Sequence, residues 1–246
     1  MSKPLADRIA LVTGASRGIG YETARALALL GAHVVALGRT VGGLEELDDA
    51  IRAADGTATL VPLDVRDTDG ILRLAAALYE RYRRLDVFVG NAGIAGSSSP
   101  LDHVEPKVWN DVLAINVTAN WHFIRAMDPL LKASDAGRAV FLTSGATHKT
   151  PAYRGPYSVS KAALEVLVRT YAAETASTRV KVNLFNPGPI RTRMRAEVMP
   201  GEDPMKLDTP DHVAEKIVAL CLPSFAQSGK LYNYPTKTLL QFRAPA

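Results

Sequence analysis

The sequence has a single cysteine, Cys221, and no apolar run approaching the ~20 residues of a membrane-spanning helix. One cysteine excludes an internal disulfide, and because Cys221 lies in the apolar stretch 217–222, we expect a buried, unreactive thiol. The first eight residues also lack the apolar centre of a secretion signal. These absences predict a cytoplasmic protein with no membrane partner.

The excess of basic residues is small, with a net charge of +4, and the cations are spread along the chain rather than gathered in a tail. Local groups occur only at 81–84 and 191–195. Charges distributed in this way usually lie on a solvated surface. We therefore expect no nucleic-acid partner, although charge alone leaves that class open.

Three glycines, Gly14, Gly18 and Gly20, join an apolar run at 9–12 to a helical pattern at 22–30. Glycine permits positive φ and lets backbone N–H groups approach an anion closely, so this stretch suits a pyrophosphate at the start of a helix. The spacing differs from the G-x-G-x-x-G dinucleotide fingerprint. An ordinary tight turn therefore fits the same residues.

Strand-like apolar runs alternate with helical patterns along the rest of the chain. This alternation is typical of βαβ units with a parallel sheet, whose ligands lie at the carboxyl ends of the strands. The chain has no obvious linker, so we expect one domain, residues 1–246. The predicted strands are 9–12, 33–37, 57–63, 85–89, 138–142, 180–185 and 230–233, and the predicted helices are 22–30, 44–54, 71–82, 106–132, 157–174 and one that starts at 209–211.

The second predicted strand ends at Gly38-Arg39, where an NAD-binding fold carries an acidic residue for the ribose hydroxyls. A guanidinium pairs well with phosphate, and Arg17 in the glycine turn could supply a second cation, so the two favour NADP. Alternatively, Arg39 caps a helix or faces solvent. Asp64, at the end of the third strand, is placed to bind an adenine amino group or to cap the next helix.

Further motifs follow in order along the chain: Asn91-Ala92-Gly93, Asn116, Ser144, Tyr157-x-x-x-Lys161 and Pro187-Gly188. With the glycine turn and Asp64, they resemble the NAD(P)-dependent short-chain dehydrogenases/reductases over almost the whole chain. Each motif is weak alone, but their joint order and spacing are specific. The resemblance implies a single-domain α/β structure, a doubly wound Rossmann fold of about seven parallel strands with helices on both faces.

The resemblance also implies hydride transfer between a nicotinamide cofactor, NADP(H) with NAD as the alternative, and a small-molecule carbonyl or secondary alcohol. The cofactor-binding residues that we assign on this basis are Gly14, Ser16, Arg17, Gly18, Ile19, Gly20, Arg39, Asp64, Val65, Asn91, Ala92, Gly93, Tyr157, Lys161, Pro187, Gly188, Ile190 and Thr192. No metal site is predicted.

Reducing a carbonyl requires a proton donor within hydrogen-bond reach of its oxygen, and Tyr157 resembles the family's acid. Lys161 shares a helix face with it, so its ammonium should lower the pKa of the phenol and hold the nicotinamide ribose. Ser144 would align the substrate oxygen. Asn116 resembles the residue that holds a water in a proton relay to the lysine. These four are the predicted catalytic residues.

Two positions depart from the family pattern. Gly90 stands where another Asn is frequent, a change we expect to be tolerated, and 232–235 lacks the usual Gly-Gly. The family pairs its two long helices, here those around Asn116 and Lys161, so we expect a homodimer or homotetramer. The departure at 232–235 makes the tetramer the less secure of the two.

The substrate itself is left open, because the pocket should be lined by the loops 94–100, 145–155 and 190–209. Arg191, Arg193 and Arg195 could receive an anionic substrate or simply be exposed on a mobile loop. Met194 and Met199 suggest an adaptable apolar lid. A protein of another class, a non-catalytic NADP-binding redox sensor, is the alternative function, although a sensor would not need a proton donor.

Overall fold

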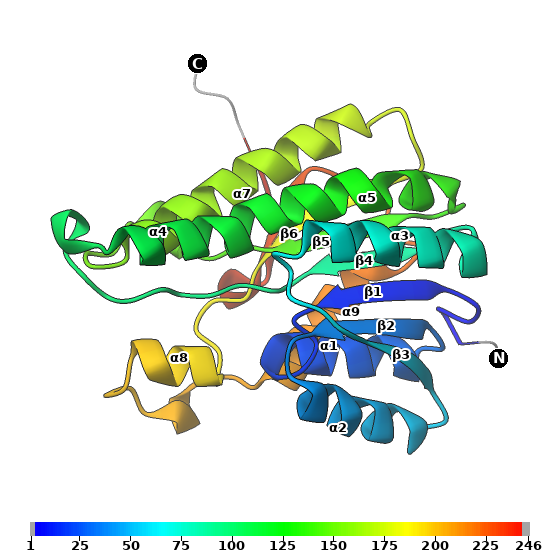
Figure 1. Cartoon of the computed structure of the whole chain (residues 1–246), viewed down its shortest axis with the longest axis horizontal. Coiled ribbons are helices and arrows are strands. Elements are labelled where there is room, and N and C mark those ends of the chain that lie inside the picture. Colours follow the sequence, from blue (N-terminus) through cyan, green and yellow to red (C-terminus); the bar gives the residue numbers. More distant parts are fainter. Residues whose placement is uncertain (1–2, 243–246) are drawn as a thin grey trace.

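One mostly parallel sheet runs through the centre of the protein, with helices on both of its faces (Figure 1). The computed structural model describes residues 3–242, so the expected domain of residues 1–246 extends beyond the described part at both ends. The strand order is β3-β2-β1-β4-β5-β6-β7-β8. The strands are β1 (Ile9–Thr13), β2 (His33–Gly38), β3 (Thr57–Pro62), β4 (Val87–Gly90), β5 (Arg138–Leu142), β6 (Lys181–Asn186), β7 (Lys230–Asn233) and β8 (Thr238–Gln241).

The first seven strands pair in parallel, which confirms the predicted doubly wound α/β fold. β8 is an addition, because it pairs with β7 in the antiparallel direction and forms the edge of the sheet. The sequence gives little sign of this strand. It is short, largely exposed, and supported by one neighbour only.

The helices form two layers. Figure 1 shows α1, α2 and α9 on one face of the sheet and α3, α4, α5 and α7 on the other, and α1 packs on α9 as α3 packs on α5. Their bounds are α1 (Gly18–Leu29), α2 (Val41–Arg52), α3 (Thr68–Tyr82), α4 (Pro106–Leu113), α5 (Ala119–Ala133), α6 (Ala146–Lys149), α7 (Gly155–Glu174), α8 (Arg193–Val198) and α9 (Pro210–Cys221). Within residues 3–242, no helix has both the length and the apolar character needed to cross a membrane.

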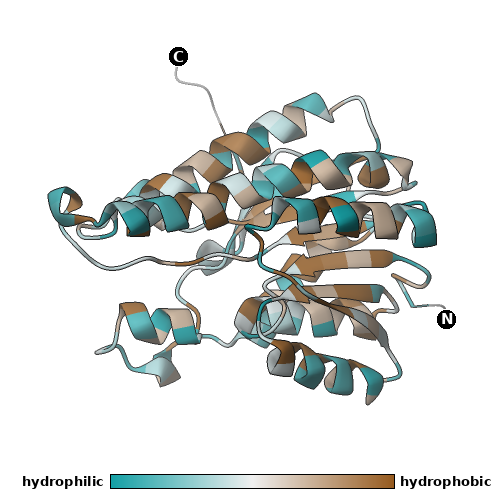
Figure 2. Ribbon diagram, viewed as in Figure 1, coloured by the Kyte–Doolittle hydropathy of each residue, from teal (hydrophilic) through white to brown (hydrophobic). Residues whose placement is uncertain are grey.

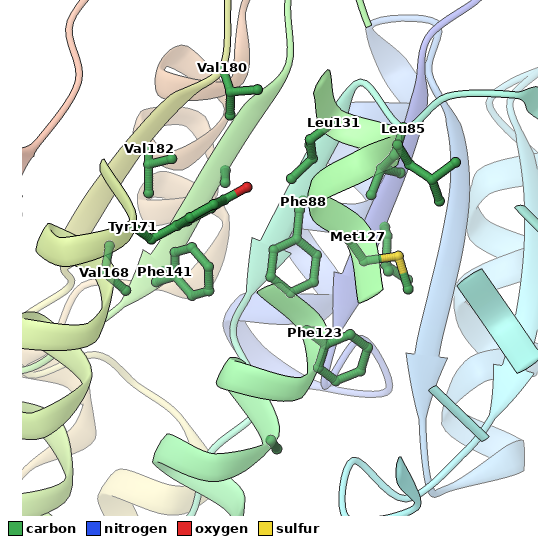
Figure 3. Packing of buried hydrophobic residues seen from close by; sticks show 14 of the residues in the cluster. Leu85, Phe88, Phe123, Met127, Leu131, Phe141, Val168, Tyr171, Val180 and Val182 are labelled. Atoms are coloured by element: carbon green, nitrogen blue, oxygen red, sulfur yellow. The ribbon is translucent and has the colours of Figure 1, made fainter. Parts of the chain in front are cut away.

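Both faces of the sheet are buried, which explains the continuous apolar runs of its central strands. Successive side chains of a strand point to opposite faces, so Leu11 joins the core under α3, α5 and α7, whereas Val12 joins the core under α1, α2 and α9. In Figure 2 the strands are accordingly hydrophobic and the helices are mixed. Figure 3 shows the first core, where the Phe88 ring lies 5.5 Å from that of Phe123 and 5.4 Å from that of Phe141.

Several predicted boundaries were wrong. α1 begins at Gly18 rather than at residue 22, because glycines of the turn already form its first turn. The predicted loops at 145–155 and 190–209 contain the short helices α6 and α8, and α8 is capped where the Thr192 hydroxyl accepts from the Arg195 N–H at 3.2 Å. α7 starts at Gly155, two residues before Tyr157.

The long helix predicted at 106–132 is interrupted by a π-helical turn, η2 (Ala114–Thr118). There the Ala119 N–H donates to the carbonyl of Ala114, five residues earlier. The Asn120 side-chain amide donates to the backbone carbonyl of Asn116 at 2.9 Å. Such turns are frequent at functional sites, and this one contains Asn116.

Candidate functional site

A cleft opens at the carboxyl ends of the strands, around the β1–β4 pair where the chain crosses from one side of the sheet to the other. Ligands of doubly wound folds bind at such a switch point. Most of the predicted site residues line this cleft: Gly14, Ser16, Arg17, Gly18, Ile19, Arg39, Asp64, Val65, Asn91, Ala92, Gly93, Tyr157, Lys161, Pro187 and Thr192.

The other predicted residues lie around the cleft without lining it. Gly20 packs beneath the turn, where an added Cβ would lie 2.3 Å from the carbonyl oxygen of Gly14. Gly188 packs against Pro235, and Ile190 is buried in the core under α1 and α9. Asn116 and Ser144 are neighbours of residues that line the cleft, and their contacts are described below.

The glycine turn fits a pyrophosphate. Gly14 and Gly18 have φ angles of 67° and 59°, in the left-handed region that favours glycine. α1 has no side-chain cap and no acidic residue in its first turn, so its leading N–H groups remain available to an anion. The Asn91 side chain also packs closely against this turn, because an added Cβ on Gly14 would lie 2.9 Å from the Asn91 amide nitrogen.

Asn91 braces this turn. Its side-chain amide donates to the carbonyl oxygens of Thr13 at 2.9 Å and Gly14 at 3.2 Å. In return, the Thr13 hydroxyl accepts from the backbone N–H groups of Asn91 and Ala92, both at 3.0 Å. The end of β4 is therefore fastened to the end of β1, and the side chain of Asn91 is committed to the protein.

Three arginines approach the far end of the cleft. Arg17 and Arg39 line it, and Arg39 Nη1 makes only a loose contact of 3.7 Å with Asp64 Oδ2. Arg66, which sequence reasoning missed, donates to Asp64 Oδ2 at 2.7 Å from its side chain and to Oδ1 at 2.9 Å from its backbone. Hydrogen bonding from the Arg66 side chain lowers the pKa of Asp64, so this carboxyl stays ionised. The Arg39 guanidinium is more than half exposed.

Tyr157 and Lys161 lie together in the cleft, one helical turn apart on α7. Lys161 Nζ donates to the Leu142 carbonyl at the end of β5, at 2.8 Å, and lies 5.9 Å from the centre of the Tyr157 ring. Burial lowers the pKa of Lys161 to about 8, partly opposed by the Glu165 carboxylate. Burial raises the pKa of Tyr157, whereas the Ser144 hydroxyl and the Arg154 guanidinium both lower it. The arrangement places a buried phenol beside a buried ammonium and a hydroxyl.

A buried carboxylate, Glu165, lies behind these groups. It follows Lys161 by one turn and is only 5% exposed. Glu165 Oε1 accepts from the hydroxyls of Thr143 at 2.7 Å and Thr147 at 3.1 Å, which flank Ser144 on either side. Sequence reasoning did not find Glu165, because a glutamate on a helix resembles any surface residue.

The side chain of Asn116 is fully engaged. Its oxygen accepts from the Ile94 N–H, and its amide donates to the Ile94 carbonyl and to the Ser160 hydroxyl, each at 2.9 Å. An added Cβ on Gly93 would lie 3.2 Å from Asn116 Oδ1 and 3.5 Å from Lys161 Nζ, so only this glycine separates the two residues.

Some cleft residues were not assigned to the site by sequence reasoning: Leu37, Gly38, Thr40, Leu63, Ile94, Ile115, Leu142 and Thr143. Arg193 and Met194, which the sequence suggested for the substrate pocket, also line the cleft. Several follow directly from the topology, since Leu37, Leu63 and Leu142 stand at or just beyond strand ends. Arg193 and Arg195 are ion-paired with Glu197 and Glu202, at 2.8 and 2.5 Å. These two guanidinium groups are therefore not the free cations that the sequence suggested.

Comparison with known proteins identifies the family of this chain. Residues 8–203 match the family model of the short chain dehydrogenases, and the chain belongs to this family. It is 40% identical to the uncharacterized oxidoreductase YciK of Escherichia coli K12 over 84% of this chain and 82% of that one. It is 34% identical to cis-4-hydroxycyclohexanecarboxylate dehydrogenase of Sinomonas cyclohexanicum over 89% of this chain and 91% of that one.

Solved structures show the same fold. A short chain dehydrogenase of Shigella flexneri 2a strain 301, crystallised with NADP, superposes with a TM-score of 0.89 at 36% identity, covering 96% of this chain and all of that one. The chain described here is thus a short-chain oxidoreductase.

Proposed function

We propose that this protein transfers a hydride between NADP(H) and a carbonyl or secondary alcohol, with Tyr157 as the proton donor or acceptor. The observation that carries the proposal is the grouping of Tyr157, Lys161 and Ser144 at one end of the cleft. The Sinomonas relative is named for a hydroxycyclohexanecarboxylate, which is a secondary alcohol.

The residues of the cleft fit the cofactor. The uncapped start of α1 and the glycine turn would hold the pyrophosphate, and Arg17 and Arg39 would receive the 2′-phosphate that distinguishes NADP from NAD. Asp64 and Val65 would border the adenine, and Asn91, Pro187 and Thr192 would border the nicotinamide half. When bound, the nicotinamide supplies the hydride for reduction or accepts it for oxidation.

The protein's own groups manage the proton. Tyr157 would donate a proton to the carbonyl oxygen, because it is the acid in the cleft that stands beside a cation. Lys161 stabilises the phenolate that results, and its hydrogen bond to the Leu142 carbonyl fixes the ammonium in place. Ser144 would orient the substrate oxygen by hydrogen bonding.

Asn116 would act through its backbone. Its side chain holds the segment at Ile94 against α7, and its carbonyl oxygen, which accepts from Asn120, keeps a second lone pair. A relay water bound there would lie close to Lys161 and could return protons from solvent.

The proposal is tested by the Tyr157→Phe variant, which keeps the ring but removes the proton donor. Turnover of a panel of ketones, aldehydes and secondary alcohols should fall by at least ~100-fold, the usual contribution of general acid catalysis. NADPH affinity, measured by fluorescence titration, should stay near that of the parent. Activity within a few-fold of the parent would remove Tyr157 from the mechanism.

We also propose that the protein assembles as a homodimer through α5 and α7. Large apolar side chains remain exposed on both helices, with Trp121 on α5 at 45% and Val166 on α7 at 60%. Burial of such side chains between two copies is favourable.

A further inference from the structure

One guanidinium beside the proton donor has no partner. Arg154 immediately precedes α7, and its Cζ lies 5.2 Å from the centre of the Tyr157 ring. Its Nη1 is buried, and among residues 3–242 no carboxylate, carbonyl or hydroxyl accepts a hydrogen bond from this guanidinium. Arg154 as a whole is half-buried, but a buried N–H group without an acceptor is costly, so its position calls for a ligand.

Two of the neighbouring arginines are already neutralised. Arg193 and Arg195 on α8 are paired with Glu197 and Glu202. Arg191 donates to the Leu207 carbonyl at 3.4 Å, which does not balance its charge, and its buried Nε has no hydrogen-bond partner among residues 3–242. Arg154 is distinguished by its position, because it is the guanidinium over the Tyr157 ring and its buried Nη1 has no partner among residues 3–242. Burial and the positive charge of Arg195 both lower the pKa of Arg154, although a guanidinium remains protonated in proteins.

Arg154 lies at the substrate end of the site. The segment around it is fastened to the loop after β4, where the Ser99 N–H donates to the Tyr153 carbonyl at 3.1 Å. The side chain of Leu101 from the same loop packs where a Cβ on Gly155 would lie. On the other side, Arg195 of α8 is near enough to repel Arg154. The guanidinium therefore lies near both Tyr157 and α8, the helix that contributes Arg193 and Met194 to the lining of the cleft.

We propose that Arg154 binds a carboxylate of the substrate, so that this protein acts on a small oxo acid or the matching hydroxy acid. The inference rests on the proposed function and adds the chemical class of its substrate. One unbalanced guanidinium matches one negative charge, and its planar fork can bind a carboxylate through two parallel hydrogen bonds. Because Arg154 is close to the Tyr157 ring, the carboxylate and the reacting carbonyl belong to one short molecule.

The test compares anionic ketones with matched neutral ones. The pairs are 4-oxopentanoate and its methyl ester, and longer oxo acids and their methyl esters. The variants are Arg154→Gln, Arg154→Lys and, as a matched control, Arg169→Gln at an exposed position of α7. The readout is the ratio of kcat/KM for acid over ester with NADPH. The ester is an internal control, since Arg154 also lowers the pKa of Tyr157 and its loss can slow both substrates.

The parent should prefer the acid by on the order of tenfold or more, as expected for a hydrogen bond between charged groups. Arg154→Gln should reduce the ratio to near one, mainly through KM. Arg154→Lys should keep part of the preference, and Arg169→Gln should keep all of it. Binding of 4-oxopentanoate to the complex of enzyme and NADP should weaken in Arg154→Gln by a similar factor.

The outcomes separate this inference from the proposed function. Equal use of acid and ester by the parent, unchanged in ratio by Arg154→Gln, would overturn the inference and leave the oxidoreductase intact. Binding of the acid that depends on Arg154, without turnover of any ketone, would support the inference and contradict the proposed function. A strong preference for an oxoalkyl phosphate of equal length would show that the bound anion is not a carboxylate.

Discussion

Arg39 illustrates how one side chain can decide cofactor choice. It directly follows β2, at the position where an acidic residue would repel a 2′-phosphate, and its loose 3.7 Å contact with Asp64 leaves it able to turn toward an anion. The Asp64 carboxylate already accepts a hydrogen bond from the Arg66 side chain, so it does not depend on Arg39 as a partner.

Arg39→Asp should therefore lower the preference for NADPH over NADH by at least ~10-fold, or about 1.4 kcal/mol. The substitution removes a cation and adds repulsion. Arg39→Gln, which only removes the cation, should fall between parent and Arg39→Asp. The measurement is kcat/KM for both cofactors with one ketone. A parent enzyme that favours NADH would contradict this reading of the end of β2.

Gly90 shows why a departure from the family pattern can be accommodated. An added Cβ would lie 2.6 Å from Phe141 Cδ1 and 2.7 Å from Asn120 Oδ1. The volume that a side chain at 90 would occupy is thus filled by a ring from β5 and an amide from α5. That amide also holds the Asn116 carbonyl, so the glycine makes room for a group that supports the π-helical turn.

At the scale of elements, α7 presents Tyr157, Lys161 and Glu165 at successive turns of one face. Glu165 affects Lys161: burial lowers the pKa of Lys161 to about 8, and the Glu165 carboxylate partly opposes this by raising it. It also fixes Thr143 and Thr147 on either side of Ser144. One carboxylate therefore influences both the charge and the geometry of the site.

The pH profile should report this coupling. Below a pH of about 8 Lys161 is a cation that supports proton donation by Tyr157, so kcat/KM for carbonyl reduction should fall as pH rises through that value. Glu165→Gln removes the charge that raises the pKa of Lys161, and the falling limb should move to lower pH. Glu174→Gln, an exposed change at the end of α7, is the matched control. A limb that stays in place, or moves to higher pH, would contradict the coupling.

At the scale of the whole molecule, exposed apolar side chains are not confined to one helix pair. Trp121 on α5 and Val166 on α7 belong to the proposed dimer face, whereas Leu72, 46% exposed, lies on α3. This distribution supplies both a test of the dimer and its control.

Light scattering at micromolar concentration should give the mass of a dimer or a larger assembly. Val166→Glu should shift the protein toward the monomer, because a charge would be buried against the second copy. Leu72→Glu introduces the same charge outside the proposed face and should leave the mass unchanged. A monomeric parent, or a mass equally sensitive to both substitutions, would refute the proposed interface.

The sequence by itself determined the family, the alternation of strands and helices, and many of the residues that line the cleft. These features depend on local properties that a linear pattern retains. Apolar runs predict buried strands, glycines permit a tight approach to an anion, and polar residues just after strands predict the edge where ligands bind.

Only the tertiary structure decided which polar groups are paired and which are not. Arg154 and Arg193 look alike in the sequence, yet Arg193 has Glu197 as a partner and Arg154 has none among the described residues. Glu165 became part of the site because β5 brings Thr143 against α7. Burial and pairing are set by contacts between segments far apart in the chain, and the cost of an unpaired charge arises only when folding removes it from water.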